Sequence, residues 1–499
     1  MNLLENLTAE DLLNKTIFIR VDFNVPLQSK SAGRFFVEGD ERIRRFLDKS
    51  FQKIHELTHG NCRIIIGSHL GRPHKFRDHA QWDGIFNLQF VCSHFETLLK
   101  RRYEDSYIVF PPESMDSQLS DSIEIIKKKQ LPLGGIKFLP NLRYLFERES
   151  DYREKFMEDL ADICDVYINC AFGTSHRESR SIIALPRLMK KNGKLYVAGV
   201  LLAEEVSRLG ELASRMLENP GKSAFLAGGS KVSDKIGLIK QFAVSGISRI
   251  LLGGKMVNSF LLARDFKING AGDLPLKLKP KEADEKSFLD EIRLAGEILE
   301  AAKDKGVEIF FPVDYKVAPA FDSKEFSISG SPDFNKELQL DLGPKTIKMY
   351  SEILQEESVK NIFWNGPMGA FDHPANKGYA EGSVEITKCL LKKCLWDRDA
   401  LSVIGGGDSA AVVQKLDLAG IRIWLAHELS KMIPMNVNHD LFEIKFPDRD
   451  LYTFMNYLTG NFFTSTGGGA SLEFLEAYLK DNGSQPYSFY LPGTRVLEE

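Results

Sequence analysis

Zinc-type cysteine pairs, long apolar runs and an excess of positive charge are all missing from this sequence. Its 499 residues include six cysteines, which lack the spacing of a metal site and stand mostly among apolar neighbours. Scattered cysteines of this kind indicate reduced thiols and argue against a disulfide framework. The formal net charge of −4 supplies no basic field for nucleic acid. No apolar run approaches the roughly 20 residues that cross a bilayer, so we expect neither a nucleic-acid nor a membrane partner.

A secretion signal and the best-known phosphate-binding motif are also absent. The N-terminal stretch MNLLENLTAEDLL is acidic and has no charged-then-apolar pattern, so we expect a cytoplasmic location. The Walker A pattern G-x-x-x-x-G-K-[ST] occurs nowhere in the chain. A nucleotide site would therefore have to be built from other glycine-containing loops.

The chain does contain a long series of short apolar runs, each followed by turn residues and a helical pattern. Examples are TIFIRV (16–21), RIIIG (63–67), SAFLAG (223–228) and LSVIG (401–405). Continuous apolar strands that alternate with helices indicate parallel sheets covered on both faces. The predicted class is α/β, with two doubly wound parallel-sheet lobes joined by a helix and hinge. In such sheets, ligands bind beyond the carboxyl ends of the strands.

The two predicted lobes have definite boundaries. The N-terminal lobe covers residues 1–196, and we expect the C-terminal tail 478–499 to return to it. A helical pattern without a flexible linker predicts a connecting helix at 197–217. The C-terminal lobe covers 218–477 and carries an extra segment at about 427–461. This segment is rich in aromatic residues, which indicates that it folds and packs.

Cationic and polar side chains gather in the predicted strand-end loops of the N-terminal lobe. Arginine makes bidentate contacts with carboxylates and phosphates, so several arginines here favour a small, multiply anionic substrate. The residues concerned are Asn24, Arg42, His69, Arg72, Arg143, His176 and Arg177.

Glycines dominate the corresponding loops of the C-terminal lobe, in GGSKVSDK (228–235), GGK (253–255), NGPMG (365–369) and GGGD (405–408). Glycine lets the backbone approach a phosphate closely, and a helix N-terminus adds a favourable dipole. Lys231 and Lys235 are four residues apart, so they would lie one above the other at the start of a helix. Both would then stand near a phosphate held by Gly228 and Gly229.

The stretch SVIGGGDSAAVV (402–413) admits two interpretations. Gly405, Gly407 and Ala410 fit the dinucleotide fingerprint G-x-G-x-x-A, and Glu428 stands near the place of a ribose-binding acid, which favours NAD without a metal. Alternatively, Asp408 indicates a nucleotide that carries Mg²⁺, because a carboxylate repels phosphate unless a cation neutralises it.

Seven segments together are far more specific than any one of them. RVDFNVP, SHLGRP, AFGTSHR, GGSKVSDKI, WNGPMGAF, GGGDSAAV and STGGGASLEFLE occur in this order and resemble the signature segments of phosphoglycerate kinase. The resemblance runs from about residue 15 to about residue 497. It implies a reversible phosphoryl transfer between 1,3-bisphosphoglycerate and MgADP, giving 3-phosphoglycerate and MgATP. It also implies a monomer and favours the Mg²⁺ interpretation of Asp408.

The resemblance further implies roles for individual residues. The triose substrate would be held by Asp22, Asn24, Arg42, His69, Arg72, Arg143 and Arg177. The nucleotide would be bound by Gly228, Gly229, Lys231, Lys235, Gly253, Gly254, Asn365, Asp372, Gly407, Asp408 and Ser409. The transferring group would meet Arg42, Lys231, Gly406 and Gly407, with Asp408 at the metal.

Several positions depart from the family pattern. Cys170 stands where an aspartate is usual, Asp372 replaces a glutamate for the ribose hydroxyls, and Lys255 replaces a small residue. None of these changes deletes a phosphate ligand. An active kinase is the favoured interpretation, and the alternative is a catalytically weakened relative that binds ligands or serves as a scaffold.

Overall fold

The chain folds into two compact units. The computed structural model describes residues 1–31, 34–73, 85–104, 106–112, 131–143, 152–230, 235–266, 270–371, 373, 377–406, 424, 428 and 460–499. One unit consists of residues 1–207 and 485–499, and the other of residues 208–484. The boundary falls within helix α10 (Val200–Glu218). Almost all of the predicted extra segment 427–461 lies outside the described residues.

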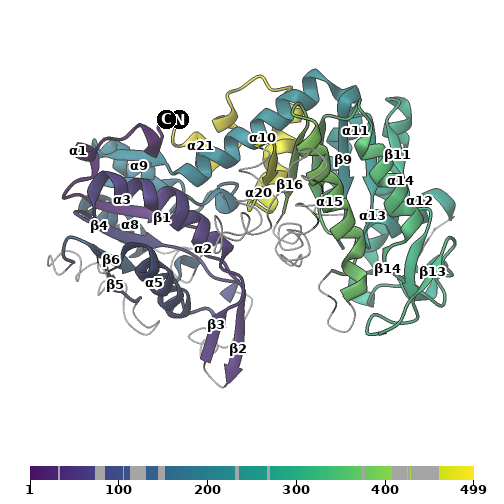
Figure 1. The fold of residues 1–499 in the computed structure, drawn as a ribbon, viewed down its shortest axis with the longest axis horizontal. Coiled ribbons are helices and arrows are strands. Elements are labelled where there is room, and N and C mark those ends of the chain that lie inside the picture. Colours follow the sequence, from purple (N-terminus) through teal and green to yellow (C-terminus); the bar gives the residue numbers. More distant parts are fainter. Residues whose placement is uncertain are drawn as a thin grey trace. The chain divides into compact units, whose positions relative to one another are not determined.

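A six-stranded, wholly parallel sheet forms the centre of the first unit (Figure 1). Its central strand TIFIR is buried along its whole length, as the continuous apolar run predicted. In spatial order the strands are β5 (Ile108–Phe110), β6 (Gly135–Phe138), β4 (Arg63–Gly67), β1 (Thr16–Arg20), β7 (Val166–Asn169) and β8 (Leu195–Ala198).

Helices cover this sheet because alternate strand residues are apolar on both faces. Ile17 and Ile19 belong to a core that includes Phe46 and Phe95, whereas Phe18 stacks on Tyr167 at 5.8 Å between ring centroids. The helical segments of this unit are η1 (Leu4–Asn6), α1 (Ala9–Leu12), α2 (Glu41–Phe46), the π-helical turn η2 (Leu47–Phe51), α3 (Gln52–Thr58), α5 (Gln89–Tyr103), α8 (Tyr152–Ile163), η5 (Phe172–Thr174) and α9 (Ala184–Lys191). A hairpin of β2 (Leu27–Ser31) and β3 (Arg34–Val37) follows β1.

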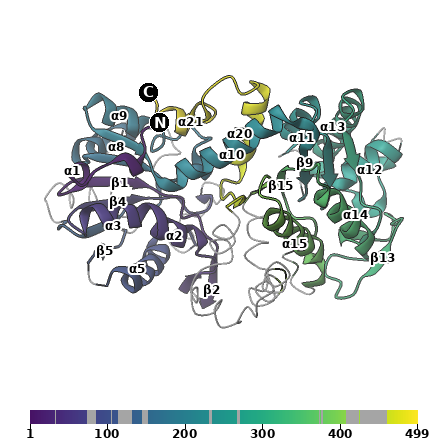
Figure 2. The same cartoon turned by 45° about the horizontal axis from the view of Figure 1, so that its top comes forward.

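Both chain ends belong to the first unit and lie side by side (Figures 1 and 2). The Met1 amino group pairs with Glu498, and the N–H of Ala198 on β8 donates to the Asn2 carbonyl at 2.8 Å. Near the C-terminus, η11 (Tyr487–Phe489) and α21 (Pro492–Arg495) bring the Gly493 N–H to the Ser175 carbonyl at 2.8 Å. The last residues of the chain therefore help to complete the N-terminal unit.

The second unit repeats the design with another parallel six-stranded sheet. Its strands, in spatial order, are β11 (Glu308–Phe310), β10 (Arg249–Leu252), β9 (Ser223–Ala227), β15 (Asn361–Asn365), β16 (Leu401–Gly405) and β17 (Phe462–Thr464). Its longer helices are α11 (Ile236–Val244), α12 (Val257–Asp265), α13 (Glu285–Asp304), α14 (Pro344–Gln355), α15 (Glu381–Trp396) and α20 (Gly469–Lys480). Short 3₁₀ turns are η6 (Pro220–Lys222), η7 (Ala271–Asp273), η8 (Leu276–Leu278), η9 (Glu282–Asp284) and η10 (Lys377–Ala380).

The two faces of this sheet are again both buried. Trp364 of β15 packs in one core with Tyr350 of α14, and on the opposite face Phe225 and Phe363 contact Phe242 of α11. The second unit also contains a small antiparallel sheet. Its strands, in spatial order, are β13 (Ser327–Ser329), β12 (Tyr315–Ala318) and β14 (Leu338–Leu342), and in the sequence they lie between β11 and β15. The prediction of two doubly wound α/β lobes is thus confirmed. No helix in the described ranges is both long and apolar enough to span a bilayer.

The six cysteines should be unreactive in the folded protein. They are all buried, and burial raises the pKa of each thiol, to about 11 for Cys62 and about 12 for Cys92 and Cys164. Cys170, Cys389 and Cys394 are raised in the same way. Because the thiolate is the nucleophile, iodoacetamide at pH 8 should leave the native chain unmodified and alkylate all six positions after unfolding in guanidinium. Mass spectrometry of both samples checks this, and rapid alkylation of the native protein would contradict it.

Candidate functional site

The cationic residues of the first unit stand at the carboxyl ends of neighbouring strands. Asp22 and Asn24 follow β1, His69 follows β4, Arg143 follows β6 and Arg177 follows β7. Since the carboxyl ends of parallel strands meet at one edge of the sheet, residues far apart in the sequence come together there. The structure therefore gathers the predicted residues around one place.

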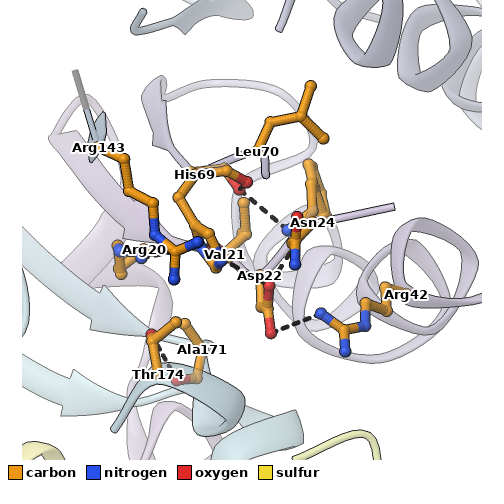
Figure 3. A network of polar contacts seen from close by, with 12 residues as sticks. Arg20, Val21, Asp22, Asn24, Arg42, His69, Leu70, Arg143, Ala171 and Thr174 are labelled. Atoms are coloured by element: carbon orange, nitrogen blue, oxygen red, sulfur yellow. Dashed lines mark hydrogen bonds and ion pairs between the residues drawn. The ribbon is translucent and has the colours of Figure 1, made fainter. Parts of the chain in front are cut away.

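Asp22 is the centre of this charged group. Its carboxylate accepts a contact from Arg42 Nη1 at 2.7 Å, and its Oδ1 lies 3.9 Å from His69 Nδ1. Figure 3 shows Arg42 pointing at the Asp22 carboxylate from one side, with Arg20 and Arg143 together on the other side near His69. Burial disfavours the ionised carboxyl, but the positive charge of Arg42 and its neighbours outweighs burial and lowers the pKa of Asp22. Asp22 is therefore an anion at neutral pH and holds the cations in place.

His69 is buried and uncharged at this site. Burial is the main reason that its pKa lies well below the usual range, and the nearby arginines act in the same direction. Its Nδ1 lies 3.4 Å from Arg20 Nη2, and because a guanidinium can only donate, Nδ1 is the acceptor. The ring proton is then on Nε2. His69 can therefore donate a hydrogen bond to an anion without contributing charge.

Arg20 is a member of the group that the sequence interpretation missed. It is 3% exposed, and burial lowers the pKa of its guanidinium to about 10, with Asp22 acting in the opposite direction. Its Nε donates to Ser181 Oγ at 3.2 Å and its Nη1 donates to the Val21 carbonyl. The sequence shows only that Arg20 ends an apolar run, and its burial, on which its role depends, appears only in the structure.

The remaining residues fix the surrounding loops. Asn24 Oδ1 accepts the Gly71 N–H at 2.8 Å, and Arg143 donates to the Gly71 carbonyl. Arg72 and Arg177 are exposed. A small cavity of about 40 Å³ is lined by Arg20, His69, Leu142, Arg143, Thr174, Arg177, Ser179 and Ser181. Three of these residues are arginines and three carry hydroxyl groups, which suits contact with one end of a small anion.

His176 lies next to Arg177 in this loop. The Arg177 Nε donates to His176 Nε2 at 3.2 Å. Burial, followed by the charge of Arg177, lowers the pKa of His176 to about 4. His176 is therefore neutral at neutral pH, like His69.

In the second unit, three glycine-containing loops contact one another through their backbones. A Cβ on Gly228 would lie 2.4 Å from the carbonyl oxygens of Gly366 and Pro367, and a Cβ on Gly254 would lie 2.5 Å from the Gly229 nitrogen. Gly229, Gly254 and Gly366 also have positive φ angles of 92°, 62° and 89°. Only glycine satisfies both conditions.

The N–H groups of these glycines are already used within the protein. Gly228 donates to the Asn365 carbonyl at 2.9 Å, Gly229 to Pro367 at 2.7 Å and Gly254 to Met368 at 2.9 Å. Gly253 likewise donates to the Ala227 carbonyl of the neighbouring strand at 2.8 Å. The glycines therefore contribute space rather than donors.

Lys235 supplies a charge beside this cradle. It precedes α11, and its Nζ lies 3.1 Å from the place that a Gly229 Cβ would take. Asn365 is buried and donates from Nδ2 to the Gly405 carbonyl at 2.7 Å, which ties the end of β15 to the end of β16. Gly406 follows with a φ of 103°. The loop after β16 thus starts with a conformation that favours glycine.

A cavity of about 570 Å³ opens beside the cradle, bordered by Gly229 and Gly254. Much of its lining is apolar, including Leu278, Tyr315, Phe321, Leu338 and Met368. Its polar members include Asn258, Gln339 and Asp341, none of which the sequence interpretation singled out. An apolar cavity next to a glycine cradle and a lysine suits a nucleotide, since the ring system needs apolar contact and the phosphates need charge.

Five predicted nucleotide residues lie outside the part of the chain that the structure describes. They are Lys231, Asp372, Gly407, Asp408 and Ser409. Within the described part, no three His, Cys, Asp or Glu residues are grouped so that they could hold a metal ion. The expectation of Mg²⁺ therefore rests on Asp408 and on the nucleotide itself.

Two departures from the family pattern can be placed. Cys170 is 5% exposed, and a Cβ on Gly199 would lie 2.2 Å from its Sγ, so this thiol packs inside the core. Lys255 is exposed at the border of the large cavity. The change at Cys170 thus removes a carboxylate from a position that here is apolar and closely packed.

Comparisons with known proteins agree with this arrangement. A sequence profile described as phosphoglycerate kinase matches residues 7–426. The chain is 32% identical to the phosphoglycerate kinase of Gloeobacter violaceus and 31% identical to that of Dictyoglomus turgidum, covering 99% of this chain and 98% of each relative. The chain belongs to the phosphoglycerate kinase family.

Solved structures of phosphoglycerate kinases also match nearly end to end. The enzyme from Pyrococcus horikoshii aligns with a TM-score of 0.68 at 25% identity, covering 100% of this chain and 98% of that one. The enzyme from Coxiella burnetii aligns with a TM-score of 0.60 at 25% identity, covering 99% and 98%. Membership of the phosphoglycerate kinase family decides against the NAD interpretation of Gly405 to Ala410.

Replacing Gly228 with alanine should destabilise the second unit. The new methyl group would overlap the carbonyls of Gly366 and Pro367, and forced overpacking costs about 1–3 kcal/mol. Gly221→Ala is the matched control, because Gly221 is exposed and has no atom within 4 Å of its Cβ position. Urea unfolding should therefore show a lower free energy of unfolding for Gly228→Ala only. Equal values for both variants would mean that the loops are not in close contact.

Proposed function

We propose that this member of the phosphoglycerate kinase family catalyses phosphoryl transfer between 1,3-bisphosphoglycerate and MgADP, in both directions, as a cytoplasmic monomer. The observation that carries the proposal is the ordered cationic group around Asp22, in which Arg42 and the buried Arg20 and His69 hold one another in place. The partners that hold this group in place are residues of the chain itself. Preorganised charge of this kind suits a substrate that carries both a carboxyl and a phosphate group.

In this proposal the first unit binds the triose substrate. Arg143, Arg72 and Arg177 contact its phosphate, while Asn24 and neutral His69 donate or accept hydrogen bonds at the other polar atoms. Arg42 faces the transferring group, and Asp22 keeps Arg42 in position through the 2.7 Å contact. The buried Arg20 donates from Nη2 to His69 Nδ1 over 3.4 Å and so orients the imidazole ring.

The second unit binds the nucleotide. Gly228, Gly229, Gly253 and Gly254 leave room for the phosphates, and Lys235 with Lys231 supplies positive charge. Asn365 fixes the end of β15 through its bond to the Gly405 carbonyl. Gly406, Gly407, Asp408 and Ser409 complete the phosphate side, and Asp372 faces the ribose. The apolar cavity next to Gly254 takes the base.

The chemistry needs positioning more than acid–base catalysis. In the ATP-consuming direction the nucleophile is a carboxylate, which is ionised at neutral pH, so no general base is required. What the chain must provide is alignment and neutralisation of developing negative charge, and Arg42 and Lys231 are suited to both. Mg²⁺ bound with the nucleotide through Asp408 would neutralise phosphate charge. A scaffold without turnover would not need Arg42 held in order by Asp22.

A coupled assay tests this function directly. We expect the purified protein to form ADP from MgATP in the presence of 3-phosphoglycerate, and to lose this activity in excess chelator. Phosphoryl transfer should also stop when 3-phosphoglycerate is omitted, which excludes simple hydrolysis. Unchanged activity with chelator, or ATP hydrolysis independent of 3-phosphoglycerate, would contradict the proposal.

Arg42→Ala should reduce kcat by about 10²- to 10³-fold, the usual scale for losing one preorganised charge at a developing anion. Arg44→Ala is the matched control, because Arg44 lies on the same helix and pairs with Asp40 at 2.8 Å, away from Asp22. Steady-state kinetics of both variants, with unfolding curves to verify folding, should separate them. If the two variants kept the same turnover, Arg42 would not act on the reacting group.

A further inference from the structure

Two carboxamide side chains stand in the largely apolar lining of the 570 Å³ cavity. Asn258 lies in the first turn of α12 and is 3% exposed, and Gln339 lies on β14. Gln339 Nε2 donates a hydrogen bond to Asn258 Oδ1. This bond uses one of the two N–H groups of the glutamine amide and fixes the direction in which the amide faces.

The amide oxygen of Gln339 has no partner among the residues that the structure describes. Gln339 Oε1 is buried and accepts no hydrogen bond from any residue in the described part of the chain. A buried oxygen without a donor is unfavourable, so a ligand that brings a donor gains by supplying it. Gln339 is among the residues that line the cavity, so its amide stands in the wall that a bound base would meet.

The backbone that carries Gln339 is irregular at this point. Lys316 pairs with Asp341 and Val317 pairs with Gln339, so Leu340 is an extra residue on β14. A bulge of this kind bends the strand and re-aims side chains, and bulges are common beside binding sites. Asp341, on the far side of the bulge, is fixed by the Gly382 N–H at 2.8 Å. The bulge and the anchored Asp341 together determine where the Gln339 side chain leaves the strand.

We propose that Gln339, positioned by Asn258, makes this nucleotide site selective for adenine over purines with an oxygen at position 6. The 6-amino group of adenine is a donor that Oε1 can accept, whereas guanine and hypoxanthine present an acceptor there. Gln339 Oε1 and an oxygen at position 6 are both acceptors, so neither would gain a hydrogen bond. A site that leaves a buried polar group unpaired discriminates strongly against such a ligand. The inference rests on the proposed function only in assuming that the purine base of the nucleotide binds in this cavity.

Binding of MgADP and MgIDP tests the proposal by titration calorimetry without any triose substrate. IDP is the sharper probe, because it changes position 6 without adding the 2-amino group of guanine. We expect the wild-type protein to bind ADP at least about tenfold more tightly than IDP. In Gln339→Leu this ratio should fall close to one through weaker binding of ADP. An unchanged ratio in Gln339→Leu, or in Gln339→Met if the first variant fails to fold, would overturn the proposal.

Variants of Asn258 separate positioning from packing. Asn258→Leu removes the oxygen that holds Gln339, so the ADP-to-IDP ratio should fall, whereas Asn258→Asp keeps an acceptor and should preserve the ratio. Leu338→Met is the control, since it alters the same cavity wall without touching the amide pair. If the ratio behaves as expected while no phosphoryl transfer to 3-phosphoglycerate occurs, only the proposed function fails. If the wild-type protein binds neither nucleotide, both fail.

Discussion

Positive charge held at the carboxyl end of β1 is the constraint on which the first unit depends. A guanidinium that is 3% exposed, as Arg20 is, loses most of its hydration, and that loss must be offset by close partners. Asp22, Ser181 and the Val21 carbonyl provide them. The same loss of hydration keeps His69 neutral, so the group combines fixed charges with one uncharged donor. A protein that needed only stability would gain little from such a buried, charged arrangement.

The second unit meets the opposite requirement. The nucleotide that we propose for it brings negative charge in a flexible chain of phosphates, so the protein must allow close approach. The contacts among Gly228, Gly254 and Gly366 leave no room for side chains, and the N–H groups of Gly228 and Gly254 donate to carbonyls of the protein itself. The loops are therefore held together by contacts within the protein, and in the proposed function the specific polar contacts come from lysine and from the cavity wall.

Much of the fold could be predicted from the sequence because it depends on local patterns. Apolar runs such as TIFIR and SAFLA alternate with helical segments, and both become buried parallel strands. The residues at their carboxyl ends, among them His69 and Arg143, could be found in the same way. Arg20 was missed because its role depends on burial, and the bond between Asn258 and Gln339 joins residues 81 positions apart, which no local pattern encodes. The hydrogen bonds that the Gly228 and Gly229 N–H groups donate to the NGPMG loop could not be predicted either, because they depend on where that loop packs.

The central claim is that the cationic group of the first unit binds the triose acid independently of the nucleotide. Titration calorimetry of 3-phosphoglycerate and of MgADP, each alone, on the wild-type protein and on Arg143→Ala tests this most directly. We expect Arg143→Ala to weaken 3-phosphoglycerate binding by at least about tenfold, as for loss of a charge-assisted contact, and to leave MgADP binding unchanged. Equal losses for both ligands, or no binding of 3-phosphoglycerate by the wild-type protein, would contradict the account.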